Sequence, residues 1–287
     1  MPEYEAIKTE VDAGVATIWF NRPQHRNTFS RQMTQELHEA LDAFEADDDV
    51  RAVVVTGAGR YFSAGADLGR GAATFSGAPA AEANGQSAPA ASPPEPRTFV
   101  SSKPWLMRTP IIAAMNGSAV GMGLTIPMTW DIRIAAAEGK YGFVFPRRGL
   151  VPEEGSTWIV PRLIGMSRAL DILLTGRIIS GTEAAEMGLM AKALPADEVL
   201  PAALELARDI AANTSPMSIA ATKALIYSGV AETDLDGHRA TESAVFRWTG
   251  KQADSGEGVM AFLEKRTPDW KLSKTKDFPP QLQGAGD

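Results

Sequence analysis

VVVTGAGRYFSAGADLGRG, residues Val53–Gly71, joins an uninterrupted apolar run to a turn built from small residues. A short apolar run between turn signals is typical of a strand that is buried on both faces of a sheet. AAMNGSAVGMGLTIPM, residues Ala113–Met128, repeats this order of buried strand and glycine-rich turn, and DIRIAAA follows as a further strand. Segments of helical periodicity alternate with these strands, so we predict an α/β fold with mainly parallel pairing.

The chain outside these stretches completes the predicted organisation. YEAIKTEVDAGVATIWFNRP predicts a hairpin that turns at Asp12–Gly14, and Ser30 is placed to cap a helix whose apolar residues run from Met33 to Phe44. From Glu154 onward the periodicity is mainly helical. Six helical segments are expected there: GSTWIVPRLIG, SRALDILLTG, GTEAAEMGL, ADEVLPAALELARDIAAN, SPMSIAATKALIYSG and TDLDGHRATESAVFRWTG.

We predict two regions, a core over residues 1–205 and a C-terminal helical region over residues 206–287. The core carries an insertion at about 69–97 that is rich in Ala, Gly, Pro and Ser. This composition buries too little apolar surface to order the segment by itself, which favours a flexible insertion. A disordered surface spacer and a mobile lid both fit an insertion of this kind.

Composition excludes several classes of chemistry. The 287 residues contain no cysteine, so disulfides, thiolate nucleophiles and cysteine metal sites are ruled out, and a cytoplasmic location is expected. No leader peptide or membrane-spanning run stands out, so we expect a soluble protein with no membrane partner. A formal net charge of -7 without a long basic run argues against nucleic acid as a partner. An anionic ligand would have to be recognised by a local cluster of cations and backbone N–H groups.

Common catalytic signatures are also missing. The three histidines, His25, His38 and His238, form no metal-ligand pattern, so no metal site is predicted. The patterns G-x-S-x-G, H-E-x-x-H, G-x-G-x-x-G and the P-loop do not occur. Serine hydrolase, zinc protease, dinucleotide-binding and nucleotide-triphosphatase functions therefore lose their main support, and each histidine is interpreted as structural.

The two glycine-rich turns indicate one specific kind of site. Ser63–Ala66 leads into Asp67 and Leu68, where a helix is expected to begin with free N–H groups pointing outward. In the second stretch, the glycines of Gly121–Gly123 let the backbone approach a ligand closely. Tight packing explains either turn by itself, but a pair of such turns can aim one N–H each at a single oxygen. That arrangement is an oxyanion hole.

Several segments in the same order resemble the crotonase, or enoyl-CoA hydratase/isomerase, superfamily, and the likeness runs from about Tyr4 to Trp270. The segments are FNRPQHRNTFS, VVVTGAGRYFSAGADL, MNGSAVGMG, DIRIAAAEGKYGF, LTGRIISGTEAAEMGL and EGVMAFLEKRTPDW. The resemblance implies a crotonase-like spiral of ββα turns and a C-terminal helical region that drives assembly into a homotrimer or a dimer of trimers. It also implies binding of an acyl-CoA thioester, with coenzyme A as part of the substrate and no other cofactor.

Carried over by position, the resemblance implies that the N–H groups of Ala66 and Met122 form the oxyanion hole around the thioester carbonyl. Contacts to the substrate or to coenzyme A are implied for His25, Arg26, Ala64, Gly65, Asp67, Leu68, Gly121, Thr125, Phe145, Phe262 and Lys265. On the residues alone, solvated surface charge explains Arg26 and Lys265 equally well.

The chain departs from the hydratase pattern at both catalytic glutamates, because Thr125 and Phe145 stand at those positions. Hydration of that kind needs two carboxylates, one to position a water and one to protonate the α-carbon. Thr125 is expected to orient a water or to pack beside the acyl chain. Phe145 is expected to make the wall of the acyl pocket apolar. The ordinary hydratase mechanism is therefore not expected.

RRGLVPEEGSTW, residues Arg147–Trp158, resembles the segment that holds the catalytic glutamate of Δ3,Δ2-enoyl-CoA isomerases, which places Glu153 at that position. A helix start explains the same residues, since proline followed by Glu153 and Glu154 suits the positive end of a helix. Glu154 is expected to have only this helical role. Arg147 and Arg148 are expected to pair with acidic neighbours, and an arginine close to Glu153 would lower its pKa.

These residues favour isomerisation of an enoyl-CoA with Glu153 as the single base. A hydratase or an acyl-CoA hydrolase that uses a Glu153-activated water is one alternative. A non-catalytic acyl-CoA-binding protein is the other.

Overall fold

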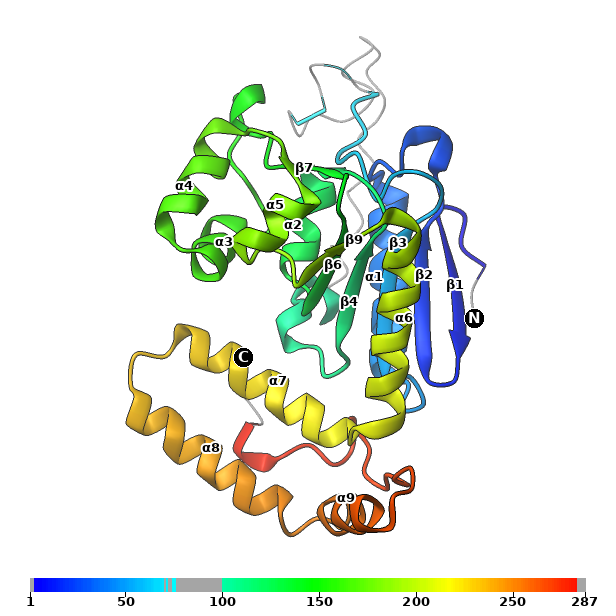
Figure 1. Cartoon of the computed structure of the whole chain (residues 1–287), viewed down its shortest axis with the longest axis vertical. Helices are drawn as coiled ribbons and strands as arrows, with labels where there is room; N and C mark the ends of the chain where they lie inside the picture. Colours follow the sequence, from blue (N-terminus) through cyan, green and yellow to red (C-terminus); the bar gives the residue numbers. More distant parts are fainter. Residues whose placement is uncertain (1–2, 70, 72–73, 76–99, 283–287) are drawn as a thin grey trace, which may run out of the picture.

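A central sheet with helices on both faces and a separate helical layer below it make up the molecule (Figure 1). The computed structural model describes residues 3–69, 71, 74–75 and 100–282, so the insertion predicted at about 69–97 lies almost entirely outside the described residues. The strands are β1 Ile7–Asp12, β2 Val15–Phe20, β3 Ala52–Gly57, β4 Ile111–Met115, β5 Ala119–Val120, β6 Ile132–Ala136, β7 Lys140–Gly142, β8 Ile179–Ser180 and β9 Lys192–Leu194. The α-helices are α1 Arg31–Ala46, α2 Met122–Met128, α3 Ser156–Ile164, α4 Met166–Thr175, α5 Gly181–Met187, α6 Ala196–Asn213, α7 Pro216–Ala231, α8 Leu235–Thr249 and α9 Ala253–Glu264. Short 3-10 helices are η1 Pro23–His25, η4 Val100–Ser102, η5 Pro104–Leu106, η6 Pro146–Arg148 and η7 Pro280–Leu282.

The strand order confirms the predicted α/β fold with mainly parallel pairing. The large sheet runs β1-β2-β3-β4-β6-β9, and every pair after the β1–β2 hairpin is parallel. Asp12 pairs with Val15 across the turn that the sequence predicts. A second, small sheet has the order β5-β7-β8, with β5 and β7 parallel and β8 antiparallel to β7.

Successive units of the chain share the order strand, strand, helix, as in β1-β2-α1, β4-β5-α2 and β6-β7-α3. In the second and third of these units, the first strand joins the large sheet and the second strand joins the small sheet. The chain therefore winds from one sheet to the other as each unit is added. This winding brings the residues after β3 beside β5, the strand that leads into α2.

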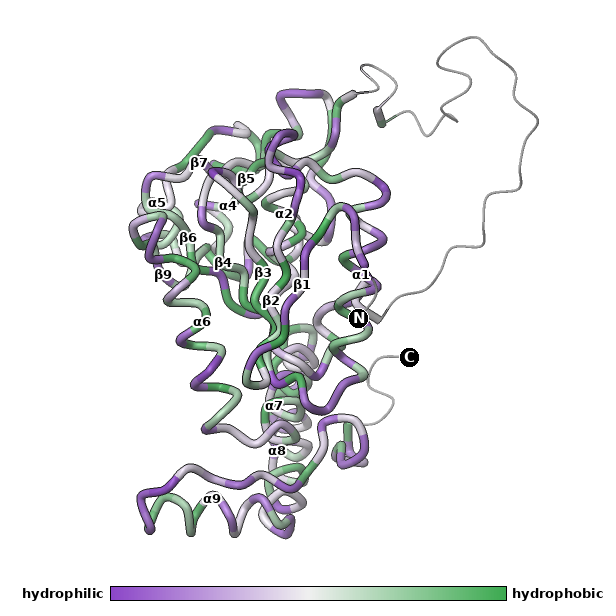
Figure 2. Tube along the Cα trace, turned by 90° about the vertical axis from the view of Figure 1, so that its right-hand side faces the viewer, coloured by the Kyte–Doolittle hydropathy of each residue, from purple (hydrophilic) through white to green (hydrophobic). Residues whose placement is uncertain are grey.

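The apolar run of β3 is continuous because both faces of the large sheet are covered. Val53 and Val55 pack in the cluster with α1, whereas Ala52 and Val54 pack in the cluster with α6. Helix α1 begins after Ser30, whose side chain accepts a backbone N–H of the first turn, as predicted. Figure 2 shows β3 and β4 as apolar segments near the centre of the core.

Helix α6 packs its apolar side along the large sheet. Its buried residues Val199, Ala203 and Ala207 recur every four positions and lie in one cluster with strand residues. The boundary predicted at 205/206 falls inside this helix. The six helical segments predicted from the sequence are observed as α3 to α8, whereas the sequence pattern did not predict α9.

Buried lysines fasten the C-terminal region to the core. Lys223 of α7 donates to the Asp131 carboxylate at 2.8 Å, and both side chains are largely buried. Further along, Lys274 is 1% exposed, and its ammonium donates to two backbone carbonyls and to Thr109 Oγ1. A buried ammonium is tolerated at this place because each of its N–H groups has an acceptor.

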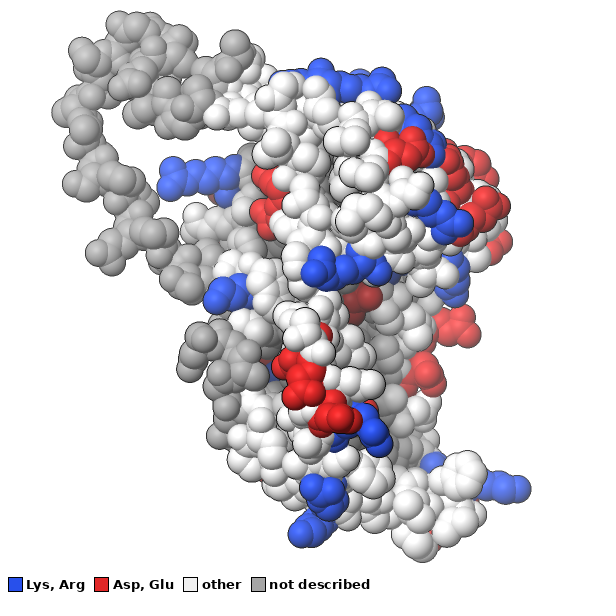
Figure 3. Space-filling view, turned by 90° about the vertical axis from the view of Figure 1, so that its left-hand side faces the viewer, with Lys and Arg blue, Asp and Glu red and all other residues white. Residues whose placement is uncertain are grey.

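Charged side chains are spread over the surface in small groups. On the face seen in Figure 3, basic and acidic side chains lie beside one another in several places, with uncharged areas around these groups. Among the described residues, no helix has the length and apolar content that crossing a membrane requires.

Candidate active site

The two glycine-rich turns lie side by side. Ser63, after β3, forms a parallel bridge to β5: its N–H donates to the Ser118 carbonyl and its carbonyl accepts the Val120 N–H, both at 3.2 Å. The approach is close enough to require glycine on each side. A Cβ on Gly65 would lie 2.6 Å from the Val120 carbonyl oxygen, and a Cβ on Gly123 would lie 2.5 Å from the Ser63 carbonyl oxygen. Backbone packing against backbone therefore accounts for the small residues of both turns.

Ala66 and Met122 have backbone N–H groups without a partner among the described residues. On the first turn, the Phe29 N–H donates to the Gly65 carbonyl and the Asp67 N–H donates to the Phe29 carbonyl, so the Ala66 N–H between them faces the other way. On the second turn, Met122 is the first residue of α2, where an N–H has no acceptor within the helix. Adjacent turns therefore present one unbonded donor each.

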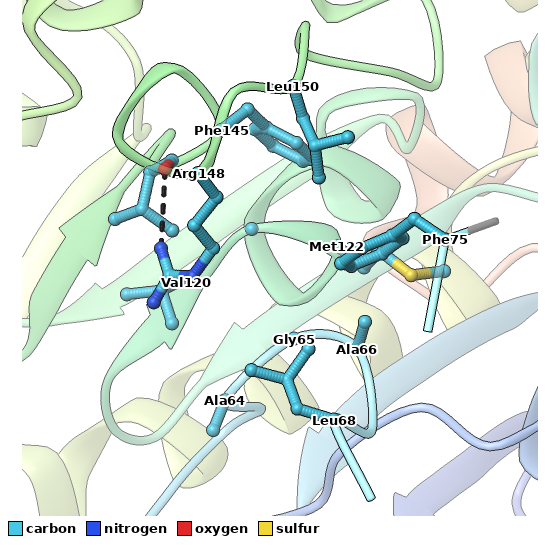
Figure 4. A pocket seen from close by; sticks show the side chains of 12 residues that line it. Ala64, Gly65, Ala66, Leu68, Phe75, Val120, Met122, Phe145, Arg148 and Leu150 are labelled. Carbon is cyan, nitrogen blue, oxygen red and sulfur yellow. Dashed lines mark hydrogen bonds between the residues drawn. The ribbon is translucent and has the colours of Figure 1, made fainter. Parts of the chain in front are cut away.

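A cavity lies between the two turns, and both residues with unbonded N–H groups line it (Figure 4). In the figure, Phe145, Arg148 and Leu150 stand on the side that faces the first turn. The lining residues are Ala64, Gly65, Ala66, Leu68, Phe75, Val120, Gly121, Met122, Val144, Phe145, Arg148 and Leu150. Gly121 has φ 55 and ψ -130, a conformation that suits glycine alone, and it starts α2 at the cavity wall.

Glu153 lies in the loop that leads from this wall to α3. The helix begins at Ser156 with Gly155 as its N-cap, so residues 152–154 precede it, and the predicted helix start at these residues is wrong. Glu154, which was expected to belong to the helix, has φ 53 and is followed by Gly155 with φ 67. This left-handed pair turns the chain before α3. The Ser156 N–H and hydroxyl both donate to the Glu153 carbonyl, at 3.0 and 2.6 Å, and hold the loop.

The Glu153 carboxyl is half-buried, and its Oε1 is buried without a hydrogen-bond partner in the described residues. Burial raises the pKa of Glu153 above its usual value, and the charge of Glu154 raises it further. Glu153 does not itself line the cavity, but Leu150 before it does, and α3 after it packs against α2. The loop with Glu153 therefore connects the cavity wall to the helix that begins at Met122. An unbonded carboxylate of raised basicity is suited to accept a proton.

Comparison with known proteins assigns the chain to a family. The protein-family model described as enoyl-CoA hydratase/isomerase matches residues 10–273 of the sequence. The chain belongs to the enoyl-CoA hydratase/isomerase family. An enoyl-CoA hydratase of Alternaria alternata is 37% identical to it over 258 residues, which are 89% of this chain and 82% of that protein. The 1,2-epoxyphenylacetyl-CoA isomerase of Escherichia coli is 35% identical over 266 residues, which are 93% of this chain and 98% of that protein.

A solved structure supports the same assignment. The crystal structure of a probable enoyl-CoA hydratase/isomerase from Mycobacterium abscessus superimposes with a TM-score of 0.81 at 36% identity, covering 92% of this chain and 98% of that one. The crotonase-like fold and the family membership predicted from the sequence are thereby confirmed.

Thr125 and Phe145 stand at the two positions where the resemblance implies the glutamates of a hydratase. Thr125 is completely buried in α2, where its hydroxyl lies 3.4 Å from the Gly121 carbonyl, and it does not line the cavity. The structure therefore does not place Thr125 where it could touch a water or an acyl group in the cavity. Phe145 is 7% exposed and lines the cavity with an apolar ring.

The loop expected to hold coenzyme A is attached to the first turn. His25 ends η1 and is exposed, as is Arg26 after it. The Arg26 carbonyl accepts the Ala64 N–H at 3.0 Å, and the Arg26 guanidinium lies 5.9 Å from the centre of the Tyr61 ring. His25 and Arg26 therefore lie next to the residues of the cavity, at the solvent.

Asp67 is engaged within the first turn. No α-helix begins at Asp67 in the described residues, contrary to the sequence prediction. Its carboxylate instead accepts the Gly69 N–H at 3.0 Å and pairs with Arg22 at 3.1 Å. These contacts lower the pKa of Asp67, the Gly69 hydrogen bond most of all. Leu68 beside it is 50% exposed and lines the cavity.

Phe262 and Lys265 do not join the cavity within one chain. Phe262 lies in α9, in the lower helical layer of Figure 1, and is 82% exposed. It lines a separate hollow between α7, α8 and α9. Lys265 follows α9 as its C-cap, has a left-handed conformation and is exposed. Their predicted contact with coenzyme A is not formed by the fold of a single chain.

Residues that organise the site without a sequence signal include Asn27 and Ser63. The buried Asn27 amide donates to the Ala58 and Tyr61 carbonyls. The Ser63 hydroxyl donates to the Asn27 carbonyl at 2.8 Å and accepts the Gly65 N–H. A polar side chain inside a glycine-rich turn is a signal that could have found Ser63, whereas the loop around Asn27 contains no glycine. In the part of the chain that the structure describes, no group of His, Asp or Glu side chains is arranged to hold a metal ion.

The tight contact at Gly65 leads to a stability prediction. Gly65 has φ 89, and Gly65→Ala would set a Cβ against the Val120 carbonyl. We expect the free energy of unfolding to fall by about 3 kcal/mol or more, since the left-handed backbone alone costs about 1–3 kcal/mol. Urea denaturation measures this loss. Gly188→Ala is the matched control because Gly188 has φ 88 but its Cβ would meet nothing closer than 3.7 Å. Equal losses for the two variants would contradict the proposed clash.

Proposed function

We propose that this protein isomerises 3-enoyl-CoA thioesters to their 2-enoyl isomers, with Glu153 as the single acid–base group. The observation that carries the proposal is the pair of unbonded N–H groups, at Ala66 and Met122, that line one cavity. Donors aimed at one point in a pocket suit the oxygen of an enolate, which is where charge develops when a proton leaves the carbon next to a thioester. Coenzyme A would be part of the substrate, and no further cofactor is needed.

The reaction balances with one carboxylate. The Glu153 carboxylate takes a proton from C2, and the electron pair moves through the carbonyl carbon onto the thioester oxygen. The N–H groups of Ala66 and Met122 hold that oxygen. Protonated Glu153 then returns the proton to C4 as the double bond shifts into conjugation. Each oxyanion donor of this kind is typically worth about 2.7–4 kcal/mol of activation free energy.

The rest of the site supports isomerisation over the two-carboxylate hydration. Phe145 gives the cavity wall no acid or base, and Thr125 is buried and does not line the cavity. Burial raises the pKa of both Glu153 and Glu154, but only Glu153 has a buried carboxyl oxygen without a partner among the described residues. The similarity to a protein named 1,2-epoxyphenylacetyl-CoA isomerase is compatible with an isomerase.

Hydration is the second candidate because several relatives are named enoyl-CoA hydratases. In that case Glu153 would activate a water that adds to the 2-enoyl thioester. An acyl-CoA hydrolase would use the same water against the carbonyl. A panel of 3-enoyl, 2-enoyl and saturated acyl-CoA thioesters, followed by mass spectrometry, separates the three reactions.

Isomerisation leaves the mass unchanged while the absorbance of the conjugated thioester grows. Hydration adds the mass of one water, and hydrolysis releases free coenzyme A. We expect the first result with 3-enoyl substrates. Turnover only of 2-enoyl or saturated thioesters would overturn the proposal, and tight binding without any turnover would identify a non-catalytic acyl-CoA-binding protein.

The raised pKa of Glu153 predicts the pH dependence of the reaction. Glu153 must be ionised to act as a base, so kcat/KM falls as the pH drops through its pKa in the folded enzyme. Burial and Glu154 both raise that pKa, so the acid limb should lie above the usual glutamate value of 4.5. Glu154→Gln removes one of these causes and should move the limb to lower pH. A pH–rate profile that is identical in the two proteins would contradict this assignment.

Further parts of the proposal concern coenzyme A and assembly. His25, Arg26 and the turn around Ala64–Leu68 would hold coenzyme A, since they lie together at the solvent side of the cavity. Phe262 and Lys265 would contribute only from a second copy of the chain, in a homotrimer or dimer of trimers. Sedimentation velocity measures the assembly, and a monomer at micromolar concentration would remove this part of the proposal.

A further inference from the structure

Arg148 brings a positive charge to a cavity that is otherwise apolar. It is the last residue of η6, and Gly149 after it caps this short helix in a left-handed conformation. The backbone of this short helix is held by the Arg148 N–H, which donates to the Phe145 carbonyl at 2.8 Å. The two neighbouring arginines of this helix, Arg147 and Arg148, make different contacts. Arg147 donates to the Thr175 carbonyl at the end of α4, whereas Arg148 lines the cavity (Figure 4).

Arg148 is exposed, and the described part of the protein bonds few of the donors of its guanidinium. Of its five N–H donors, the described residues provide an acceptor for Nη1 alone, the Val144 carbonyl at 3.2 Å. No ion pair to Arg148 is formed within the described ranges, contrary to the pairing with acidic neighbours expected from the sequence. Every other lining residue is a glycine or has an apolar side chain. The fork of the guanidinium is therefore available to a ligand in this cavity.

The position of Arg148 indicates which part of a thioester it would meet. Phe145, Arg148 and Leu150 share the wall that leads to Glu153, across the cavity from the Ala64–Leu68 turn. If the thioester oxygen lies at Ala66 and Met122 and the base is Glu153, the acyl chain runs along this wall. Coenzyme A leaves on the other side, toward the turn and His25. Arg148 therefore faces the acyl group.

We infer that Arg148 makes the enzyme selective for acyl groups that carry a carboxylate on the chain. This inference rests on the proposed function for the direction of the acyl chain. Guanidinium and carboxylate are matched in shape, and two parallel N–H···O bonds fix the carboxylate in one orientation. An acyl chain that ends in a methyl group would leave the guanidinium facing apolar atoms, which loses part of its hydration without replacement. Selectivity would thus come both from the hydrogen bonds gained with a carboxylate and from the hydration lost beside a methyl-ended chain.

Binding of saturated thioesters tests the inference without requiring turnover. The probes are succinyl-, adipoyl- and suberoyl-CoA, each paired with butyryl-, hexanoyl- or octanoyl-CoA of the same length, and free coenzyme A. Isothermal titration calorimetry compares the unmodified protein with Arg148→Gln, Arg148→Lys and Arg147→Gln. Arg147→Gln is the matched control because it removes the same charge from the same short helix but not from the cavity.

We expect at least one dicarboxylic thioester to bind about 10- to 100-fold more tightly than its methyl-ended partner, the range typical of a charge-assisted contact. Arg148→Gln should abolish this preference, Arg148→Lys should retain part of it, and Arg147→Gln should leave it within about twofold. Equal binding of all pairs by the unmodified protein would overturn the inference. A loss in Arg148→Gln that is the same for free coenzyme A and for every thioester would also overturn it, since Arg148 would then contact a phosphate of the coenzyme.

Because these thioesters lack the double bond, the result does not depend on whether the protein is an isomerase. Failure of the proposed function would appear in the enoyl-CoA panel instead. If the preference is found, the substrate class follows as enoyl-CoA esters of dicarboxylic acids. The reaction that supplies such a substrate would then be one that activates or desaturates a dicarboxylic acid as its coenzyme A thioester.

Discussion

Glu153→Gln is expected to lower kcat for the conversion of a 3-enoyl-CoA to its 2-enoyl isomer by a factor of about 1,000, within the range attributed to a positioned general base. Glutamine has the same shape but cannot take the proton from C2. KM should change little, because the substrate is held mainly by contacts to coenzyme A and to the oxyanion donors. Steady-state kinetics, with the absorbance of the conjugated product as the signal, measures the loss.

The matched control for this experiment is Glu154→Gln. Glu154 precedes the same helix, but its side chain is exposed, and we expect kcat within about threefold of the unmodified enzyme.

The stability of Glu153→Gln gives a second readout. Because the folded-state pKa of Glu153 is raised, the ionised form is disfavoured in the fold, and above that pKa the ionised side chain destabilises the protein. Glu153→Gln should therefore be at least as stable as the unmodified protein at neutral pH. Unchanged turnover in a stable Glu153→Gln variant would mean that another group carries the proton.

The central strands of the fold and the two glycine-rich turns of the site could be predicted from the sequence, because their apolar runs and glycines are local signals. Val53–Val55 is continuous in its apolar character because α1 and α6 cover both faces of the sheet. Gly65 and Gly123 are small because each turn packs its backbone against the other. Sequence patterns of this kind record the close approach directly, so the pair of turns could be recognised before the structure was known.

The loop before α3 shows why local patterns also mislead. Proline followed by two glutamates fits the first turn of a helix, but two successive left-handed residues, Glu154 and Gly155, delay the start of α3 to Ser156. A non-glycine residue in this conformation costs about 1–2 kcal/mol, so propensity does not predict it. This strained backbone lies in the loop that holds Glu153, whose carboxyl is half-buried and whose Oε1 has no partner among the described residues. Strain of this kind is common at functional sites.

Other elements depend on contacts that are distant in sequence. The strands of the small sheet are only two or three residues long, too short to have a period of their own. Helix α9 contains Gly256 and Gly258, which disfavour a helix. Its first turn is supported by Asp254, whose carboxylate accepts the Lys271 N–H and the Ser215 hydroxyl. The sequence likewise does not distinguish which of the two arginines in η6 faces the cavity.

Met122→Pro tests the oxyanion hole by removing one backbone donor. Proline is tolerated at the first position of a helix, where its missing N–H would have no helical acceptor, and the Met122 N–H is unbonded in the protein. Gly121 before it has no Cβ to clash with the proline ring. We therefore expect the variant to fold, while kcat falls by a factor of about 100–1,000, the usual effect of losing one oxyanion donor. Met122→Leu keeps the N–H and changes only the side chain, so its kcat should stay within about threefold. If Met122→Pro is folded and retains full turnover, the enolate oxygen is not held at Met122, and the site must bind the thioester in another orientation.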